Sequence, residues 1–339
     1  MERNGVMKKV NIKLYIKSFE QFKYFLQRIL TIFSDNASHL EINLVMNSLD
    51  DCEIEKILNY ISSCHIFKEI SNDTIYTFIV TVNPSHKLPK LFTKIRRLLC
   101  RINLINIGDF YKVAGVVESF QKKKLPLSLI IKDNDLKGII DRYKEFSPLG
   151  IPIFIENDIC YDDEFLSLFE EWIFDRSGYR INIFADILSK VLLDSWGTIC
   201  KYKSCLTKYF AVDENGNIYS CCSQNNEICN LRDVFTLIDL FSHEKFILLL
   251  KGSITKRSHC KDSCNFYGVC QGGCPMDATI SIENCKSKQL FMIMEDITVK
   301  IKDIINNHNY SDLNPAVREL ILSSVASNKL FEKGLFDEN

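Results

Sequence analysis

Apolar and polar residues alternate with two different periods along the first half of the chain. In short segments apolar residues recur at every second position, as in strands, and in the segments that follow they recur every three or four positions, as in amphipathic helices. The expected strands are 10–16, 40–46, 75–82, 103–107, 127–131 and 151–155. The expected helices are 19–33, a helix that follows Asp50 and Asp51 and ends at about 63, 91–102, a helix between 107 and 121, 136–146 and 164–174. Six such units predict an α/β fold with a parallel sheet and right-handed crossovers. They are too few for the eight-stranded barrel.

The pattern changes in the second half of the chain. It loosens between 176 and 199, which predicts a link between two parts. Two short strands, 209–212 and 218–221, then flank Asn215-Gly216, a dipeptide typical of β-hairpins. Further helices are expected at 242–250, 290–305 and 314–331. The resulting division is an α/β part over 1–175, a link over 176–199, a small Cys-rich domain over 200–290 and C-terminal helices over 291–339.

Composition and charge exclude several classes of protein. With 339 residues, 46% hydrophobic and 25% charged, the chain is typical of a globular protein with one large and one smaller domain. The 42 Lys+Arg balance 43 Asp+Glu, so no global field attracts nucleic acid or an anionic membrane. No apolar run reaches membrane-spanning length. The amino terminus lacks the apolar stretch of a signal peptide, which predicts a cytoplasmic protein whose thiols stay reduced.

Cysteines are concentrated in one stretch. Ten of the 14 lie between Cys200 and Cys285, and a C-x3-C-x5-C-x3-C-P run forms the core of that stretch. The candidate metal ligands are Cys200, Cys205, Cys221, Cys260, Cys264, Cys270, Cys274 and Cys285. Disulfides would require an oxidising compartment. Zinc, usually held by four ligands in a closed tetrahedron, is an alternative.

Iron–sulfur chemistry is the interpretation that the local sequence favours. Clusters are held by four thiolates from short Cys-rich runs, and a proline after the last cysteine, here Pro275, recurs in such loops. Gly268, Gly272 and Gly273 let backbone N–H groups approach sulfide closely. The stretch is therefore predicted to bind iron–sulfur clusters.

The array of cysteines resembles the SPASM domain of radical-SAM peptide and protein maturases. The resemblance implies two [4Fe-4S] clusters, one on Cys200, Cys205, Cys221 and Cys274 and the other on Cys260, Cys264, Cys270 and Cys285. The family has C-x2-C where this chain has Cys260-x3-Cys264, a one-residue departure that bears on the ligand role of Cys264. Cys222 and Cys229 are left over and are interpreted as small buried hydrophobes.

The first half resembles a radical-SAM enzyme core that has lost its cofactor site, and the resemblance implies an open six-unit (β/α) partial barrel over 1–175. That family carries C-x3-C-x2-C after the first strand and Gly-Gly-Glu-Pro after the second. The cysteines available here are Cys52, Cys64, Cys100 and Cys160, with 11, 35 and 59 residues between them, and the second position reads Asn47-Ser-Leu-Asp50. We therefore expect no bound SAM, and we interpret these four cysteines as buried or incidental thiols.

The resemblance implies a protein of peptide maturation. SPASM-like proteins without the SAM cluster occur beside enzymes that make ribosomally synthesised, modified peptides (RiPPs), including the grasp-with-spasm type. The expected partners are a precursor peptide and an ATP-grasp or other modifying enzyme, with this protein as a scaffold or electron relay. One alternative is a peptide-modifying enzyme with an atypical SAM site. Another is a zinc-stabilised interaction module.

Basic residues form two stretches that offer one further binding hypothesis. They are Lys87, Lys90, Lys94, Arg96, Arg97 and Arg101 in the first, and Lys122, Lys123 and Lys124 in the second. Such residues usually form the solvated face of an amphipathic helix. The alternative is a docking strip for an acidic precursor peptide, whose binding salt would weaken.

Overall fold

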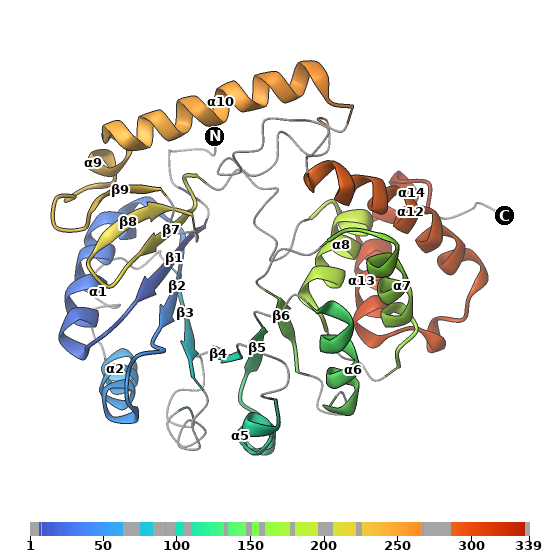
Figure 1. The fold of residues 1–339 in the computed structure, drawn as a ribbon, viewed down its shortest axis with the longest axis horizontal. Helices are drawn as coiled ribbons and strands as arrows, with labels where there is room; N and C mark the ends of the chain where they lie inside the picture. Colours follow the sequence, from blue (N-terminus) through green and yellow to red (C-terminus); the bar gives the residue numbers. More distant parts are fainter. Residues whose placement is uncertain are drawn as a thin grey trace. The chain divides into compact units, whose positions relative to one another are not determined.

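The protein is described by a computed structural model in which the chain divides into two compact units. The described residues are 7, 9–63, 75–83, 92, 99–104, 110–131, 135–146, 151–155, 160–176, 180–195, 206–221, 226–265, 267 and 286–335. Unit 1 comprises 1–103, 111–128 and 204–255, and unit 2 comprises 104–110, 129–203 and 256–339. Each unit therefore combines segments from both halves of the sequence (Figure 1).

Unit 1 is built on a mainly parallel sheet. Its strands lie in the order β4 (Leu99–Leu104), β3 (Ile75–Val82), β2 (His39–Val45), β1 (Val10–Tyr15), β7 (Tyr209–Val212), β8 (Asn217–Ser220) and β9 (Glu227–Asn230). The pairs from β4 to β7 are parallel, and β8 and β9 continue the sheet in antiparallel fashion. The predicted α/β class with parallel strands is confirmed.

One face of this sheet is apolar and packs against helices α1 (Phe19–Phe33) and α2 (Asp51–Ser63), which follow β1 and β2 and lie on the same side of it (Figure 1). Alternate strand residues are fully buried there: Val10, Ile12, Leu14, Leu40, Ile42 and Leu44. The Ser18 hydroxyl accepts the Gln21 N–H and caps α1. The sequence periods predicted these strands and helices closely, because each has one apolar and one polar side.

Helix α9 (Leu237–Ser242) belongs to unit 1, and helix α10 (Glu244–Ser263) belongs to unit 1 as far as Thr255. Thr236 and Asp239 form a capping box at the start of α9. Phe241 stacks on Phe246 of α10 at 5.0 Å between ring centroids. The predicted helix 242–250 was too short, because α10 continues through Gly252 to Ser263. A side chain at position 252 would meet no atom within 4 Å, so close packing does not require this glycine. A glycine weakens a helix without ending it unless the backbone turns left-handed there.

Unit 2 is mainly helical. Strands β5 (Leu127–Ile131), whose first two residues lie in unit 1, and β6 (Ile153–Ile155) pair in parallel through Leu129, Ile130 and Ile131. The helices of the unit are α6 (Leu136–Phe146), α7 (Asp163–Ile173), α8 (Asn182–Leu193), α12 (Lys286–Asn307), α13 (Pro315–Ala326) and α14 (Lys329–Glu332), with a short 3-10 turn over Tyr310–Asp312. Helix α5 (Phe110–Lys122) belongs almost wholly to unit 1.

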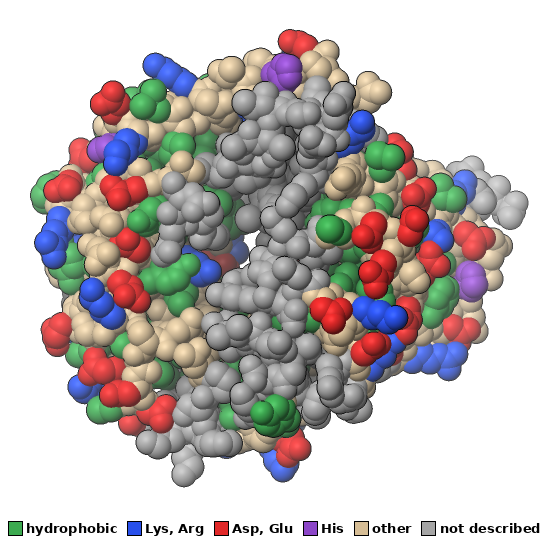
Figure 2. All heavy atoms as spheres, in the orientation of Figure 1, with side chains coloured by type: hydrophobic (Ala, Val, Ile, Leu, Met, Phe, Trp, Pro, Cys, Tyr) green, Lys and Arg blue, Asp and Glu red, His purple; other side chains and the backbone are tan. Residues whose placement is uncertain are grey.

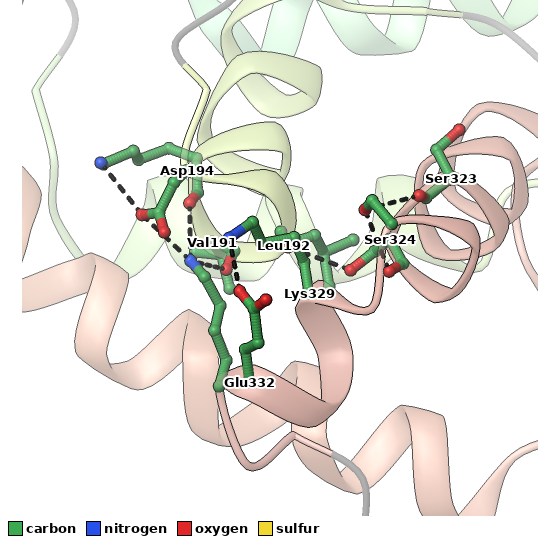
Figure 3. Close-up of polar contacts among 10 residues, drawn as sticks. Val191, Leu192, Asp194, Ser323, Ser324, Lys329 and Glu332 are labelled. Atoms are coloured by element: carbon green, nitrogen blue, oxygen red, sulfur yellow. Dashed lines mark hydrogen bonds and ion pairs between the residues drawn. The ribbon is translucent and has the colours of Figure 1, made fainter.

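Three polar side chains near the C-terminus bind main-chain atoms of α7 and α8. Asn314, fully buried, donates from Nδ2 to the Trp172 carbonyl oxygen at 3.2 Å. The Ser324 hydroxyl donates to the Leu192 carbonyl oxygen at 3.0 Å, and Lys333 Nζ donates to the Val191 carbonyl oxygen at 2.7 Å. Figure 3 shows this end of α8 against α13 and α14. The last two helices are thereby attached to the centre of unit 2.

Two sequence expectations change in the structure. The predicted helix 91–102 runs too far, since β4 begins at Leu99 and pairs with β3 through Leu99, Cys100 and Ile102. The apolar run there fits both the helical and the strand period, and pairing with β3 makes its last part a strand. The interval 176–199, predicted as a link, contains α8. Among the described residues, no helix is both long enough and apolar enough to cross a bilayer.

Candidate metal centre and a polar sheet face

Three of the eight predicted metal ligands lie in the described part of the chain. Cys221 belongs to unit 1, and Cys260 and Cys264 belong to unit 2. The remaining five, Cys200, Cys205, Cys270, Cys274 and Cys285, lie outside the described residues. Within the described residues, no group of three or more His, Cys, Asp or Glu side chains could hold a metal ion.

Cys221 follows β8 in an unusual backbone conformation. It is 5% exposed and has φ 97°, in a region that residues with a side chain rarely adopt. Its N–H donates to the Tyr209 carbonyl oxygen at 2.8 Å, which fixes the chain where it leaves the sheet. Such strain costs about 1–3 kcal/mol and persists where the surroundings or a function hold it. A ligand role for Cys221 would account for it.

A polar network holds the hairpin that carries Cys221. Gly216 has φ 86° and its N–H donates to the Asp213 carbonyl oxygen, closing the turn. The Asp213 carboxylate accepts the backbone N–H groups of Asn215 and Asn217 and the Tyr219 hydroxyl. Burial alone would raise the pKa of Asp213, but the hydrogen bonds from Asn217, Asn215 and Tyr219 lower it below its usual value. The hairpin is thus rigid beside Cys221.

Cys260 and Cys264 lie at the C-terminal end of α10. The Cys264 N–H donates to the Cys260 carbonyl oxygen at 2.9 Å, the bond of a regular helical turn, and both side chains are partly exposed. Residues four apart on a helix are neighbours, with Cβ atoms about 5–6 Å apart. The C-x3-C spacing therefore places both thiols on one side of the helix, where one cluster could contact them.

The remaining described cysteines are unlike metal ligands. Cys229 is buried in β9, and burial raises the pKa of its thiol to about 11. Cys100 is buried in β4, where burial raises its pKa well above the usual range. Cys52 and Cys160 are exposed, in α2 and before α7. The buried thiols of Cys100 and Cys229 therefore favour the protonated form, in line with the small-hydrophobe interpretation of Cys229. Cys64 and Cys222 lie outside the described residues.

The connection after the first strand is too short for a cluster-binding loop. β1 ends at Tyr15 and α1 begins at Phe19, so that only the three residues Ile16, Lys17 and Ser18 join them. None of the three is a cysteine. After β2, the carbonyl oxygen of Asn47 accepts a hydrogen bond from Nδ2 of Asn83, which follows β3.

The second face of the unit 1 sheet, called the polar face below, mixes polar side chains with the buried apolar residues Ala211, Ile79 and Val45. Sequence reasoning did not single it out. Residues that pair across parallel strands share a face. The register gives three rows on it: Tyr209–Asn11–Glu41–Thr77, Ala211–Lys13–Asn43–Ile79 and Tyr15–Val45–Thr81. Parallel sheets usually bury apolar residues on both faces. The sequence signal that could have predicted this face is the polar residues that alternate with apolar ones within 10–16 and 40–46.

Side chains on this face contact one another. The contacts are Thr81 Oγ1 to Asn43 Oδ1 at 2.9 Å, His39 Nε2 with Thr77 Oγ1 at 2.9 Å, Lys9 Nζ to Glu41 Oε2 at 2.8 Å, and Lys13 Nζ at 5.5 Å from the centre of the Tyr15 ring. Burial, with the nearby Lys9 charge, lowers the pKa of His39. The face offers hydrogen-bond donors and acceptors of the kind that bind peptide amides.

The basic stretches are described only in part. Lys122, Lys123 and Lys124 are exposed at the end of α5, and Lys122 lies 3.7 Å from Glu118. The side chains of the first stretch lie outside the described residues. Figure 2 shows acidic and basic side chains interspersed over the described surface on the visible face. The solvated-face interpretation therefore suffices for the second stretch.

Comparison with known proteins identifies the fold. No protein-family model matches the chain, and no curated protein matches its sequence. Solved structures of anSMEcpe, a SPASM-domain radical-SAM sulfatase-maturating enzyme, are similar. A hexahistidine-tagged form with bound AdoMet has a TM-score of 0.64 at 16% identity, over 86% of this chain and 98% of that one. The native enzyme with AdoMet and the Cp18Cys peptide has 0.62 at 16%, over 86% and 99%. The chain thus has a fold related to radical-SAM/SPASM proteins.

Proposed function

We propose that this protein binds a precursor peptide for maturation, that its Cys-rich region holds two [4Fe-4S] clusters, and that it serves a partner modifying enzyme, of the ATP-grasp or another class, as scaffold or electron relay. One observation supports the proposal: a fold similar to that of solved radical-SAM/SPASM proteins, in which three residues without cysteine join β1 to α1. We infer that this connection holds no catalytic cluster, whereas ten cysteines lie in the second half of the chain.

The cluster ligands would be the two sets that the resemblance implies. Cys260 and Cys264 fit one set, since the helical turn between them brings both thiols to one side. Cys221 fits the other, because a bound cluster would account for its strained backbone. When bound, such clusters supply one-electron transfer. The chain's own part is to hold the thiolates and to fix the Cys221 hairpin through Asp213.

The precursor peptide would lie on the polar face of β1–β3. A peptide presents alternating N–H and C=O groups, and Asn43, Thr81 and Lys13 provide complementary groups in adjacent rows. The structure of a similar fold with a bound peptide supports the assignment.

Metal analysis tests the cluster assignment. Protein purified without air should carry about eight irons and as many sulfides per chain, with the EPR signals of two cubanes after reduction. About two zinc ions and a colourless protein would instead support the interaction-module alternative. Cys52→Ala, on an exposed thiol of α2, is the matched control and should retain all the iron.

SAM cleavage tests the scaffold role. The alternative of an enzyme with an atypical SAM site has one observation in its favour, the AdoMet bound in the structures of similar fold. The reduced, cluster-loaded protein should form no 5′-deoxyadenosine from SAM. Formation by the protein alone, beyond that of a heat-treated sample, would replace the scaffold role with catalysis.

The proposed peptide site on the polar face is tested by measuring the binding of peptides that are encoded beside the gene for this protein. Lys13→Met should weaken the binding of the cognate peptide about tenfold, because a charged hydrogen bond is worth roughly 1.5 kcal/mol or more. Lys137→Met, on the exposed side of α6, is the control. Equal affinities of both variants for the peptide would show that the peptide does not bind to this face.

A further inference from the structure

Helix α10 carries an exposed stripe with an unusual composition. Ile247 is 38% exposed and Ile254 is 63% exposed, although both are large aliphatic residues. They lie seven residues apart, about two helical turns, and therefore on one side of the helix. Lys251 lies between them on the same side and is exposed. The α10 stripe, Ile247, Lys251 and Ile254, is thus apolar at both ends and positive at its middle.

Helix α12 carries a matching stripe of opposite charge. Met292 is 52% exposed and Val299 is 71% exposed, again seven residues apart. Asp296 lies between them at the position that Lys251 occupies in α10, and Glu295 adjoins it, both exposed. The α12 stripe, Met292, Asp296 and Val299, is therefore apolar at both ends and negative at its middle.

We propose that these two stripes bind each other between two copies of this chain. Each apolar pair spans about 10 Å along its helix, so the isoleucines of one copy can cover the Met292 and Val299 side chains of the other. The Lys251 ammonium then lies opposite the Asp296 carboxylate whether the two helices run parallel or antiparallel. In the parallel pairing the two residues are level, and in the antiparallel pairing they are about one residue apart. In the described part of the chain, neither group has an ion-pair partner.

Exposure and charge both favour a second copy as the occupant. Exposed apolar side chains in a row mark interaction sites on soluble proteins. A second copy is the partner whose complementary surface is known, with the same spacing and the opposite charge. The contact joins two different surfaces, so that it is heterologous, and it closes into a pair only if both stripes of each copy are used. The inference does not depend on the proposed function.

The expected association is weak and sensitive to salt. Two short helical stripes bury less than the roughly 1,200 Å² of a standard stable interface. The central charge pair is exposed, and salt screens such pairs. We therefore expect a dissociation constant in the micromolar range that rises with ionic strength.

Sedimentation velocity of the full-length, cluster-loaded protein under anaerobic, reducing conditions tests the proposal. The weight-average mass should rise with concentration at low salt. Lys251→Glu and Asp296→Lys should each weaken association about 10-fold, because each brings like charges together. The double variant should recover to within about 3-fold of the parent. Lys137→Glu, an equal change of charge on α6, should leave association unchanged.

Three results would overturn the proposal: a monomer at all concentrations, single variants that associate like the parent, or a double variant that fails to recover. Circular dichroism of each variant provides the check on folding, and the replaced side chains are exposed in the single chain. Ile254→Ser adds a test without a change of charge, and it should weaken association by a similar factor.

Discussion

Units 1 and 2 are each completed by the second half of the chain, but through different kinds of bond. In unit 1, β7 returns to pair with β1 by main-chain hydrogen bonds, as in the register of Asn11 with Tyr209. In unit 2, the returning helices use side chains, as in Asn314 with the Trp172 carbonyl oxygen. A main-chain ladder survives the exchange of side chains, whereas a side-chain bond is lost with a single residue. Unit 2 should therefore be the more sensitive to substitution.

The largest effect should come from loss of a proposed cluster ligand, because it removes a metal bond rather than a main-chain or side-chain hydrogen bond. Cys270→Ala or Cys274→Ala should lower the iron content, by about four irons per chain, and the melting temperature together, because metal binding free energy is folding free energy. Cys52→Ala should change neither. Full iron and an unchanged melting temperature in both variants would refute the ligand assignment.

The next largest effect is expected in unit 2 at Asn314. Asn314→Ala removes the cap of α13, where Oδ1 accepts the Ala316 N–H at 2.9 Å, and leaves the Trp172 carbonyl oxygen without its donor. The free energy of unfolding, from urea titration, should fall by about 2–4 kcal/mol. Asn307→Ala, on the exposed side of α12, should change it by less than about 0.5 kcal/mol. Similar losses in both variants would contradict the comparison of the units.

Unit 1 has one side chain on which its hairpin depends, and its effect should vary with pH. Asp213→Asn should lower the free energy of unfolding by about 1–2 kcal/mol at pH 7, because the amide cannot accept all the bonds that the carboxylate accepts. The folded-state pKa of Asp213 lies below the unfolded value. Its contribution is therefore complete above the unfolded pKa and is lost as the pH falls through the folded one.

Urea midpoints of parent and Asp213→Asn, measured from pH 7 to pH 3, should differ by a constant amount down to about pH 4 and begin to converge below it. Asp233→Asn, in the turn after β9, controls for the general effect of acid. A difference between parent and Asp213→Asn that stays constant over this range would show that the carboxylate charge does not stabilise the turn.

The smallest effect is expected at the C-terminal end of α8. Lys333 donates to the Val191 carbonyl oxygen and lies 3.1 Å from Asp194, so Lys333→Met removes a cation from a helix C-terminus. The loss should be about 1 kcal/mol by urea titration. Lys329→Met removes the ion pair with Glu332, drawn in Figure 3, and should cost less because that pair lies at the surface. A larger loss for Lys329→Met would reverse the ranking.

Helices with one buried face were predicted from the sequence, and a helix buried all round was not. In α1 the apolar residues recur at helical spacing, and the predicted bounds agree with the structure. In α8 nearly every residue from Ile183 to Leu192 is buried. A helix without a polar face has no period, so its segment was interpreted as a link.

The candidate site was only partly visible in the sequence. The spacing of cysteines predicts metal ligands by type, and this stays a prediction. The helical turn from Cys260 to Cys264 is the structural feature that would let a C-x3-C spacing place two thiols on one side. That turn depends on α10 continuing past Gly252, which local signals do not determine. The polar sheet face depends on strand register, which joins residues such as Lys13 and Asn43 from separate segments.

The short connection between β1 and α1 limits what protein engineering could do with this chain. Three residues, with Ser18 already engaged as the helix cap, cannot be converted by point substitutions into the longer C-x3-C-x2-C loop. Installing that loop would require an insertion that also supplies a new cap for α1.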